Sequence, residues 1–247
     1  MNIVVCYNDK KKFQEFSKLL IDEDCSIHSI ENIENIHSIP SAYNLLFKKI
    51  KSEYIIYLHQ DVIIPSNWKI KICDQIKEIE KIDKKWGVIG IMGVKNNGFF
   101  AGHIIDPHTR SRFCSLPCEV ETLDEVCLVL RRDANLKFDE YLGGFHFYGA
   151  DICLQARQKR LKCYAIDAPI QHLSGGKADQ SFWEMAKKMK SKWSQIDGSI
   201  NTIETTCGVF KLNDKIWTNI EYLYKNVRRK FIRRLQKRHI NQSHENK

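Results

Sequence analysis

Three polar residues able to bind a ligand, His59, Gln60 and Asp61, directly follow the apolar segment Tyr54–Leu58. That segment consists of isoleucine, leucine and tyrosine without Gly or Pro, which is typical of a buried parallel strand. Polar side chains at the end of a buried strand are costly unless they have partners, and in open α/β sheets ligands bind at this edge. We therefore expect a ligand site at residues 59–61, with a strand that simply ends in water as the alternative.

Strands and helices alternate over the first ~95 residues, so this strand belongs to a larger sheet. The alternation predicts an α/β fold with a mostly parallel, doubly wound sheet flanked by helices. By contrast, residues 95–119 show no hydrophobic period and are predicted to form a long loop or a hairpin over the sheet. Ser41 is the expected N-cap of the second helix. The predicted strands are 2–7, 26–30, 54–58, 87–93, 125–131 and 163–166, and the predicted helices are 10–20, 40–50, 65–81, 151–160 and 179–195.

The composition is that of a globular protein. Of the 247 residues 43% are hydrophobic, which is enough for a substantial core, and one large domain with an appendage is expected. No apolar run approaches the ~18 residues of a transmembrane helix. The N-terminal residues enter a strand without a basic and then apolar leader, so no signal peptide is expected. These features predict a cytoplasmic protein.

Nine cysteines are present, and none of them forms a Cys-x-x-Cys pair. An odd number without that spacing argues against a disulfide framework, and several of the cysteines lie among apolar residues, as core residues do. His103, His108, Cys114 and Cys118 have side chains that suit zinc, but their spacing matches no known ligand pattern. A zinc site and a plain loop both remain open for this segment.

The net charge of +9 is concentrated near the C-terminus. Residues 225–238 carry eight Lys or Arg residues and no acidic residue, and the rest of the chain is close to neutral. Apolar residues recur at helical spacing within 217–235, which predicts a basic amphipathic helix. Such a helix fits an anionic membrane surface; a solvated helix docked on the core and a nucleic-acid-binding helix are the alternatives. We divide the chain into a domain at 1–200 and a C-terminal extension at 201–247.

Six short motifs follow one another in a defined order. They are Ala42-Tyr43-Asn44, His59-Gln60-Asp61, Glu121-Thr122-Leu123-Asp124-Glu125, Phe138-Asp139-Glu140, Phe147–Leu154 and Gln171-His172. Their order resembles that of GT-A-fold glycosyltransferases, in particular the bacterial group related to the family-two inverting enzymes. The resemblance covers about residues 1–180 and rests on the joint order of the motifs, because each motif is short.

The resemblance implies a GT-A fold with a C-terminal helical extension and transfer of a sugar from a nucleotide-sugar donor, with a UDP-sugar as the first expectation. Such enzymes hold a divalent metal, Mn²⁺ or Mg²⁺, with an Asp-x-Asp motif at a strand end. Here His59 stands in the first position and Asp61 in the second. By the resemblance, Asp61 and His172 are predicted metal ligands, and His59 and Gln60 are predicted to meet the donor ribose or diphosphate. A partly buried structural histidine is the alternative for His172.

Asp151 matches the family's general base, which takes a proton from the acceptor hydroxyl in an inverting displacement. It stands at the start of a predicted helix, where the helix dipole also favours a carboxylate, so a capping role is the alternative. The preceding residue is Ala150, where the family has an acid. This departure, together with His59, leaves open a catalytically inactive scaffold of the same fold.

The resemblance also implies positions at the donor and the acceptor. The implied donor residues are Tyr7, Asn8, Asn44, Asp124 and Glu125, and the implied acceptor residues are Asp139, Glu140 and His146. Strand-end turns, a helix-surface Asn and solvated acids are the alternative explanations. The expected partners are a nucleotide-sugar and a saccharide or lipid-linked acceptor, in a cytoplasmic or membrane-peripheral step of bacterial surface glycan synthesis.

Overall fold

The computed structural model describes residues 1–20, 25–107, 110–176 and 178–245, with the backbone alone for residues 110 and 237–245. His108 therefore lies outside the described residues, as do the side chains of Lys237 and Arg238. The elements are β1 (Asn2–Tyr7), α1 (Lys10–Lys18), β2 (Ser26–Glu31), α2 (Ile39–Lys49), β3 (Tyr54–Leu58), β4 (Val62–Ile63), α3 (Trp68–Ile82), β5 (Val88–Gly90), β6 (Met92–Val94), β7 (Phe100–Ile105), β8 (Arg110–Phe113), β9 (Cys118–Val120), β10 (Thr122–Leu123), β11 (Cys127–Arg131), a 3₁₀ turn (Arg132–Ala134), α4 (Tyr148–Gln158), β12 (Cys163–Ala165), β13 (Gln171–His172), α5 (Gln180–Ile196), β14 (Thr202–Glu204), β15 (Val209–Lys211) and α6 (Ile216–Glu245).

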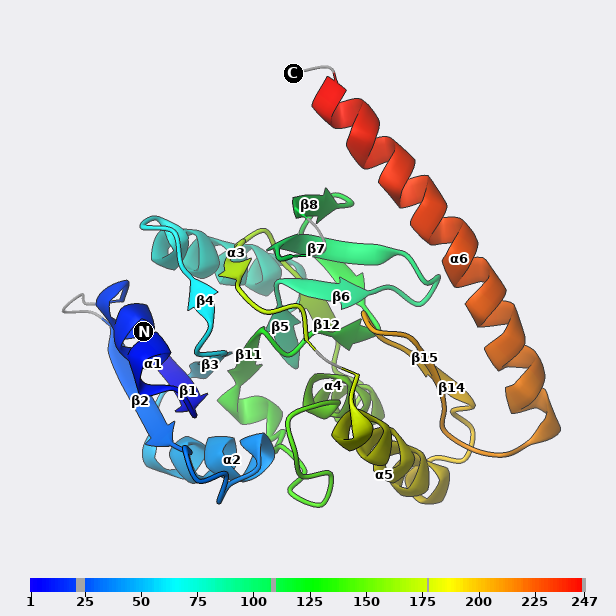
Figure 1. Ribbon diagram of the computed structural model, residues 1–247, viewed down its shortest axis with the longest axis horizontal. Helices are drawn as coiled ribbons and strands as arrows, with labels where there is room; N and C mark the ends of the chain where they lie inside the picture. The colour runs from blue at the N-terminus through cyan, green and yellow to red at the C-terminus, as the bar shows by residue number, and fades with distance from the viewer. Residues whose placement is uncertain (21–24, 108–109, 177, 246–247) are drawn as a thin grey trace.

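A seven-stranded sheet in the order β2-β1-β3-β11-β5-β12-β9 forms the centre of the molecule (Figure 1). β1 pairs in parallel with β2 and β3, and β5 pairs in parallel with β12. β11 lies between β3 and β5 and runs antiparallel to both, and β9 runs antiparallel to β12. The predicted α/β fold with a mostly parallel sheet is confirmed, with β11 and β9 as reversed strands.

Helices cover both faces of this sheet because successive side chains of a strand point to opposite faces. Ile3 and Val5 of β1 belong to a buried cluster with α1 and α3, whereas Val4 and Cys6 belong to a cluster with α2 and α4. Each of these four side chains is buried, which explains the continuous apolar run of the strand.

Two helices begin earlier than the sequence predicts. α2 is capped by Ser38, whose hydroxyl accepts a hydrogen bond from the Ser41 amide, so the predicted cap Ser41 lies inside the helix. Ser38 is extended and can therefore turn its side chain onto the first amides. α4 begins at Tyr148 rather than at Asp151, directly after Phe147 with a φ of 65°.

Of the two forms predicted for residues 95–119, the structure has the hairpin, in which β7 and β8 pair in antiparallel. β6, β7 and β8 form an antiparallel meander within a second sheet, ordered β10-β6-β7-β13-β4 with β8 on β7. The turn between β6 and β7 contains Asn97 and Gly98, with a φ of 81° at Gly98. An Asn-Gly pair is typical of a hairpin turn, and it gives no hydrophobic periodicity. The predicted strand at 87–93 is divided at Ile91 between the two sheets, as β5 and β6.

The C-terminal elements pack beside α4. α5 and the hairpin of β14 and β15 share a third buried cluster with α4, and α6 lies against that hairpin at one edge of the molecule (Figure 1). No helix among the described residues combines the length and the apolar character needed to cross a bilayer. The division of the chain at residue 200 stays a prediction.

Candidate functional site

Side chains from two segments far apart in the sequence meet at the carboxyl end of β3. His59 and Asp61 follow β3 directly, and His172 belongs to β13. Pairing of β13 with β4 sets His172 opposite Val62, and the Leu173 amide donates a hydrogen bond to the Asp61 carbonyl at 2.9 Å. The second sheet therefore delivers His172 to the end of a strand of the first sheet.

These three residues, which we call the His-Asp-His cluster, have the geometry of a metal site. Their ligand atoms all lie within 4.8 Å of one another. An Asp61 carboxylate oxygen lies 3.5 Å from Nε2 of His172 and 3.9 Å from Nδ1 of His59. One carboxylate and two imidazoles suit a divalent transition metal such as manganese. Among the described residues, no other group of three His, Cys, Asp or Glu side chains has this geometry.

The electrostatics of the cluster also favour a bound cation. Burial would raise the pKa of Asp61, but contact with His172 and the neighbouring His59 hold that pKa below its ordinary value. Burial and the nearby His172 lower the pKa of His59 to about 4, so its imidazole is neutral at neutral pH. Although burial opposes it, Asp61 raises the pKa of His172. A carboxylate and a neutral imidazole are the forms that bind metal, and a cation would displace the proton from His172.

Neighbouring residues fix the orientation of the cluster. Nε2 of His59 lies 2.8 Å from the Tyr148 hydroxyl, which leaves Nδ1 on the side of Asp61. The Gln60 side chain turns toward β1, where its Oε1 accepts hydrogen bonds from the amides of Asn8 and Asp9, each at 3.0 Å. Gln60 thus ties the end of β3 to the end of β1, and its predicted contact with the donor stays a prediction.

A cavity of about 190 Å³ opens at the ends of β1 and β3, and residues 59–61 form part of its wall. Tyr7 and Asn8 line the same cavity. The Tyr7 ring stacks on Phe13 with centroids 4.0 Å apart, and its hydroxyl donates to Glu31 at 2.9 Å. The structure therefore brings the predicted donor residues at the end of β1 together with the His-Asp-His cluster.

Asp124 and Glu125 also lie at this edge, between β10 and β11. The Val126 carbonyl accepts a hydrogen bond from the His59 amide at 3.2 Å, which sets their segment beside the end of β3. Asp124 accepts a hydrogen bond from the Thr206 hydroxyl at 2.7 Å, and its charge acts on both imidazoles of the cluster. These two acids therefore belong to the same site.

Asp151, the predicted base, is engaged elsewhere. It lies in the first turn of α4 and is 1% exposed. Its carboxylate accepts hydrogen bonds from the Lys192 ammonium at 2.6 Å, the Trp193 indole at 2.8 Å and the Gln155 amide at 2.7 Å. A carboxylate so occupied must give up a partner before it can meet an acceptor hydroxyl. Its catalytic role stays a prediction, and these contacts favour a role in tying α4 to α5.

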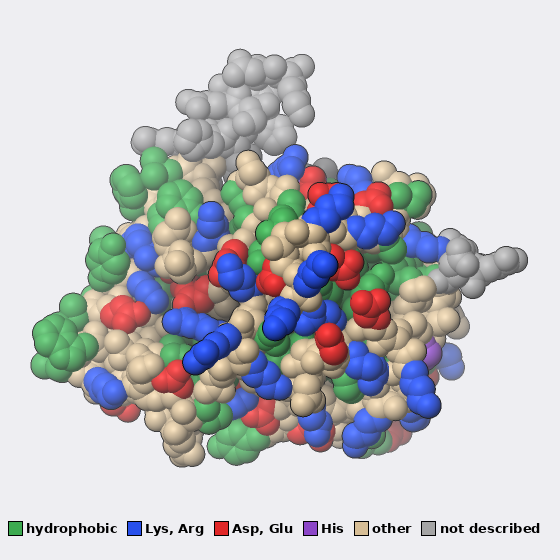
Figure 2. Space-filling model, turned by 180° about the vertical axis from the view of Figure 1, so that it is seen from behind, with side chains coloured by type: hydrophobic (Ala, Val, Ile, Leu, Met, Phe, Trp, Pro, Cys, Tyr) green, Lys and Arg blue, Asp and Glu red, His purple; other side chains and the backbone are tan. Residues whose placement is uncertain are grey.

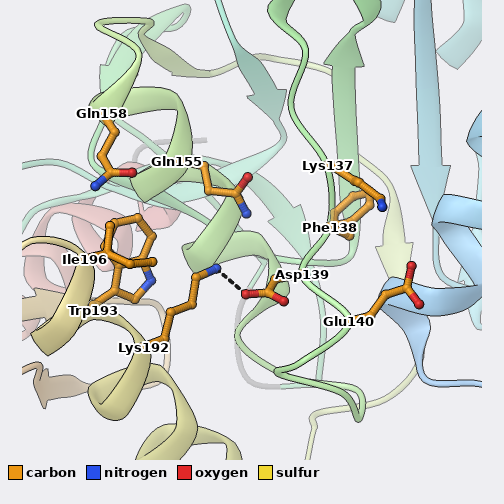
Figure 3. Close-up of a pocket in the computed structure, with 9 residues that line it drawn as sticks. All are labelled: Lys137, Phe138, Asp139, Glu140, Gln155, Gln158, Lys192, Trp193 and Ile196. Atoms are coloured by element: carbon orange, nitrogen blue, oxygen red, sulfur yellow. Dashed lines mark ion pairs between the residues drawn. The ribbon is translucent and has the colours of Figure 1, made fainter.

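The predicted acceptor residues Asp139 and Glu140 line a second cavity of about 470 Å³ (Figure 3). Asp139 and Lys192 point toward one another there and form an ion pair at 2.6 Å. Glu140 accepts a hydrogen bond from the Asn44 amide at 2.9 Å, and Asn44 also donates to the Phe138 carbonyl at 2.8 Å. Asn44 is 3% exposed and anchors this loop, so its predicted contact with the donor stays a prediction.

Two residues at the site were not singled out by the sequence. Tyr148 contacts His59, and Thr206 contacts Asp124. Tyr148 stands inside the motif Phe147–Leu154, which was the available signal, whereas Thr206 belongs to no motif. The predicted acceptor residue His146 packs edge-on against Phe182 at 5.2 Å, and its charge helps to lower the pKa of His59.

The Cys/His segment does not gather a metal site among the described residues. The sulfurs of Cys114 and Cys118 lie 3.2 Å apart, whereas Nδ1 of His103 pairs with Asp167 at 2.7 Å. The zinc site that the sequence left open therefore finds no support among these residues.

Comparison with known proteins bears on the whole arrangement. A family model described as "Glycosyltransferase like family" matches residues 2–198. A protein of Fuscovulum blasticum named "ATP synthase subunits region ORF 6" is 32% identical over 160 residues, which are 62% of this chain and 64% of that protein. S. aureus TarS 1-349 has a similar fold, with a TM-score of 0.52 and 14% identity over 79% of this chain and 66% of that one. GalNAc-T7, solved with UDP, GalNAc and Mn²⁺, has a TM-score of 0.51 and 9% identity over 76% of this chain and 47% of that one.

The chain thus spans less than two thirds of the length of the relative and structures named above. At these identities the structures show the fold alone, and that fold is the predicted GT-A fold. The family match covers most of the chain, so the chain belongs to the glycosyltransferase-like family, as its motif order predicts.

Proposed function

We propose that this protein transfers a sugar from a nucleotide-sugar donor to a saccharide or lipid-linked acceptor. The observation that carries the proposal is the His-Asp-His cluster beside the cavity at the ends of β1 and β3. In α/β sheets the carboxyl ends of parallel strands are the usual ligand edge, and a diphosphate needs positive charge or a cation there. The cavity then takes the nucleoside and the cluster takes the diphosphate.

A divalent metal fits the cluster on the chemistry of its donor set. Asp61 and His172 would hold it, with His59 as a further ligand or as a contact to the diphosphate. When bound, the metal supplies Lewis-acid stabilisation of the negative charge on the departing diphosphate. Asp61 is already kept ionised by its two histidine neighbours, so the site has its negative ligand in place at neutral pH.

We propose UDP as the nucleotide of the donor. Two proteins with a similar fold support this choice: TarS was solved in complex with UDP-GlcNAc, and GalNAc-T7 with UDP, GalNAc and Mn²⁺. Inversion at the sugar carbon and a place in surface glycan synthesis are part of the proposal and follow from the motif resemblance. For the base, that resemblance points to Asp151.

We also propose that α6 attaches the protein to a membrane surface, with a geometry that differs from a simple basic helix. Three of its arginines face inward: Arg228 and Arg229 bind the buried Glu204 at 2.7 and 3.1 Å, and Arg233 lies 3.0 Å over the Phe100 ring. Its apolar residues face outward, and hydrophobic side chains project from the edge of the molecule where α6 lies (Figure 2). The outward residues, each more than half exposed, are Ile216, Trp217, Ile220, Leu223, Tyr224, Val227 and Phe231.

The outward stripe fits the interfacial layer of a bilayer, where apolar and aromatic side chains enter and exposed Lys230 and Arg234 meet anionic headgroups. Because the inward arginines are occupied by the protein itself, we propose no nucleic-acid role for them. We expect Leu223→Glu to reduce sedimentation with phosphatidylglycerol-containing vesicles by at least tenfold, since it places a charge in the apolar layer. Ile82→Glu, on the exposed face of α3, is the matched control. Equal binding of wild type and Leu223→Glu would contradict the membrane proposal.

The donor site is tested by ligand-induced thermal stabilisation. UDP, GDP, dTDP and CMP are added with and without Mn²⁺ to wild type and to Asp61→Ala, because a ligand of the folded state raises the melting temperature with its concentration over Kd. We expect a manganese-dependent rise with UDP that Asp61→Ala abolishes. No rise with any nucleotide would overturn the proposed function and favour an inactive scaffold of the same fold.

A further inference from the structure

Glu125 is a carboxyl group at the site for which the motif resemblance gives only a donor contact. It lies between β10 and β11, next to Asp124 and one residue before Val126, whose carbonyl accepts the His59 amide at 3.2 Å. Its side chain is half-buried, unlike that of the buried Asp151. Glu125 therefore reaches the site from the same sheet edge as the His-Asp-His cluster.

The start of α4 is shaped to receive this side chain. A Glu125 carboxylate oxygen accepts a hydrogen bond from the Gly149 amide at 3.2 Å. A Cβ at position 149 would lie only 3.1 Å from Cγ of Glu125 and 2.8 Å from the Leu123 carbonyl oxygen, so the glycine leaves room for the acid. A helix N-terminus also favours a carboxylate, which holds Glu125 in one orientation.

Tyr148 connects Glu125 to the cluster. Its hydroxyl lies 2.8 Å from Nε2 of His59 and 3.4 Å from the backbone carbonyl of Glu125. Tyr148 thus holds the backbone of Glu125 beside the proposed diphosphate-binding imidazole, while the Gly149 amide holds the carboxylate. A base in an in-line displacement needs this kind of fixed relation to the donor.

The surroundings make Glu125 a stronger base than an ordinary glutamate. Burial, and then the negative charge of Asp124, raise the pKa of Glu125 to about 8, although the Gly149 amide opposes the shift. The other titratable groups that face it are Tyr148 and Cys153 on α4 and Cys207 in the turn between β14 and β15. Among the described residues no Lys or Arg pairs with it. Glu125 thus meets the requirement for a base tuned near the working pH.

We infer that Glu125 is the general base of the proposed transfer, and that Gly149 and Tyr148 position it. The inference rests on the proposed function. The Glu125 carboxylate takes the proton of the acceptor hydroxyl while the acceptor oxygen forms a bond to the anomeric carbon. The bond from that carbon to the diphosphate oxygen breaks, and its electron pair leaves with the nucleoside diphosphate.

The test compares Glu125→Gln, Glu125→Asp and Asp151→Asn with wild type. UDP release is measured from UDP-GlcNAc, UDP-GalNAc, UDP-glucose and UDP-galactose, with methyl glycosides or water as acceptor, across pH 5 to 9. We expect Glu125→Gln to lower kcat by ~10²–10⁴ and to remove the rise of rate with pH, while the manganese-dependent thermal shift with UDP is kept. Glu125→Asp should retain part of the activity and the pH-dependent rise. Glu119→Gln, an exposed acid on β9 paired with Lys162, is the control and should equal wild type.

Three results would overturn the inference. The first is a Glu125→Gln rate within threefold of wild type, and the second is loss of the pH-dependent rise in Asp151→Asn but not in Glu125→Gln, which would return the base to Asp151. Absence of UDP release by wild type that still shows the thermal shift also overturns it, and leaves a binding protein. Absence of both the release and the shift is instead the failure of the proposed function.

Discussion

Two groups of buried charge on this fold use the same residue type in opposite ways. In the His-Asp-His cluster, Asp61 faces two imidazoles at 3.5 and 3.9 Å, distances that leave its oxygens open to a cation. In the second group, Asp151 and Asp139 share the ammonium of Lys192, at 2.6 Å from each. The first group pairs its carboxylate with imidazoles, which can give up a proton to a metal, whereas the second holds an ammonium between two carboxylates.

The two groups differ in the partners that bind each carboxylate. A buried acid that already holds an ammonium and neutral donors is satisfied within the protein, and breaking that pair is costly. An acid among imidazoles stays ionised and still has coordination to offer. Glu125 is a third case, because it is half-buried beside another acid and, within the part of the chain that the structure describes, is bound by an amide and by no cation. The ion-pair and hydrogen-bond partners of a carboxylate therefore indicate whether it is free to bind a metal or to accept a proton.

The largest expected effect tests the second group, in which Asp139 and Asp151 share the Lys192 ammonium. Lys192→Met leaves two carboxylates without their counter-ion, and one of them, Asp151, is fully buried. We expect a loss of about 3–5 kcal/mol in the free energy of unfolding, the range for breaking a buried pair. Urea unfolding measures it. Lys190→Met on the same helix, whose partner Asp214 is exposed, should change stability by less than about 1 kcal/mol. Equal effects of the two variants would contradict the distinction between the groups.

The next effect concerns the pH dependence of stability at Glu125. Its folded-state pKa of about 8 lies above the ordinary value of 4.5, so between these values the folded protein binds more protons than the unfolded chain. Stability from this group is therefore full below pH 4.5 and is lost as the pH rises through 8. From pH 5 to pH 8 wild type should lose on the order of 2 kcal/mol relative to Glu125→Gln, after allowance for solvent screening of a half-buried group. Denaturant unfolding at both pH values measures this difference. An equal change in the free energy of unfolding for wild type and Glu125→Gln between the two pH values would contradict the raised pKa of Glu125.

The smallest effect concerns the His-Asp-His cluster. Tyr148→Phe removes the hydroxyl that contacts Nε2 of His59 at 2.8 Å and leaves the ring packed against Tyr43 and Phe138. Residues that orient metal ligands typically contribute about 10–100-fold in metal affinity, so we expect manganese binding to weaken by about tenfold. Titration of Mn²⁺ by electron paramagnetic resonance measures it. Tyr141→Phe, at an exposed tyrosine, is the control, and unchanged affinity in Tyr148→Phe would separate Tyr148 from the cluster.

Local patterns in the sequence carried much of the fold. The apolar runs of β1 and β3 and the helical period of α3 predict their elements within three residues, because both faces of these strands and one face of this helix are buried. For residues 95–119 the sequence predicted a loop or a hairpin without strand bounds, because these strands are defined by a turn and by pairing rather than by a hydrophobic period. The sequence predicted the apolar face of α6 but did not determine whether that face points outward or toward the core.

The sequence by itself determined the residue types of the site: His59 and Asp61 at a strand end, a late His172, and acids at 124, 125 and 151. Their order also determined the family, since a motif order is a property of the chain. Only the tertiary structure decided which of these residues meet and which are occupied. β13 returns beside β4 to bring His172 to Asp61, and α5 delivers Lys192 to Asp151. Availability of a charged group depends on partners supplied by distant segments, and the spacing of residues along the chain does not contain that information.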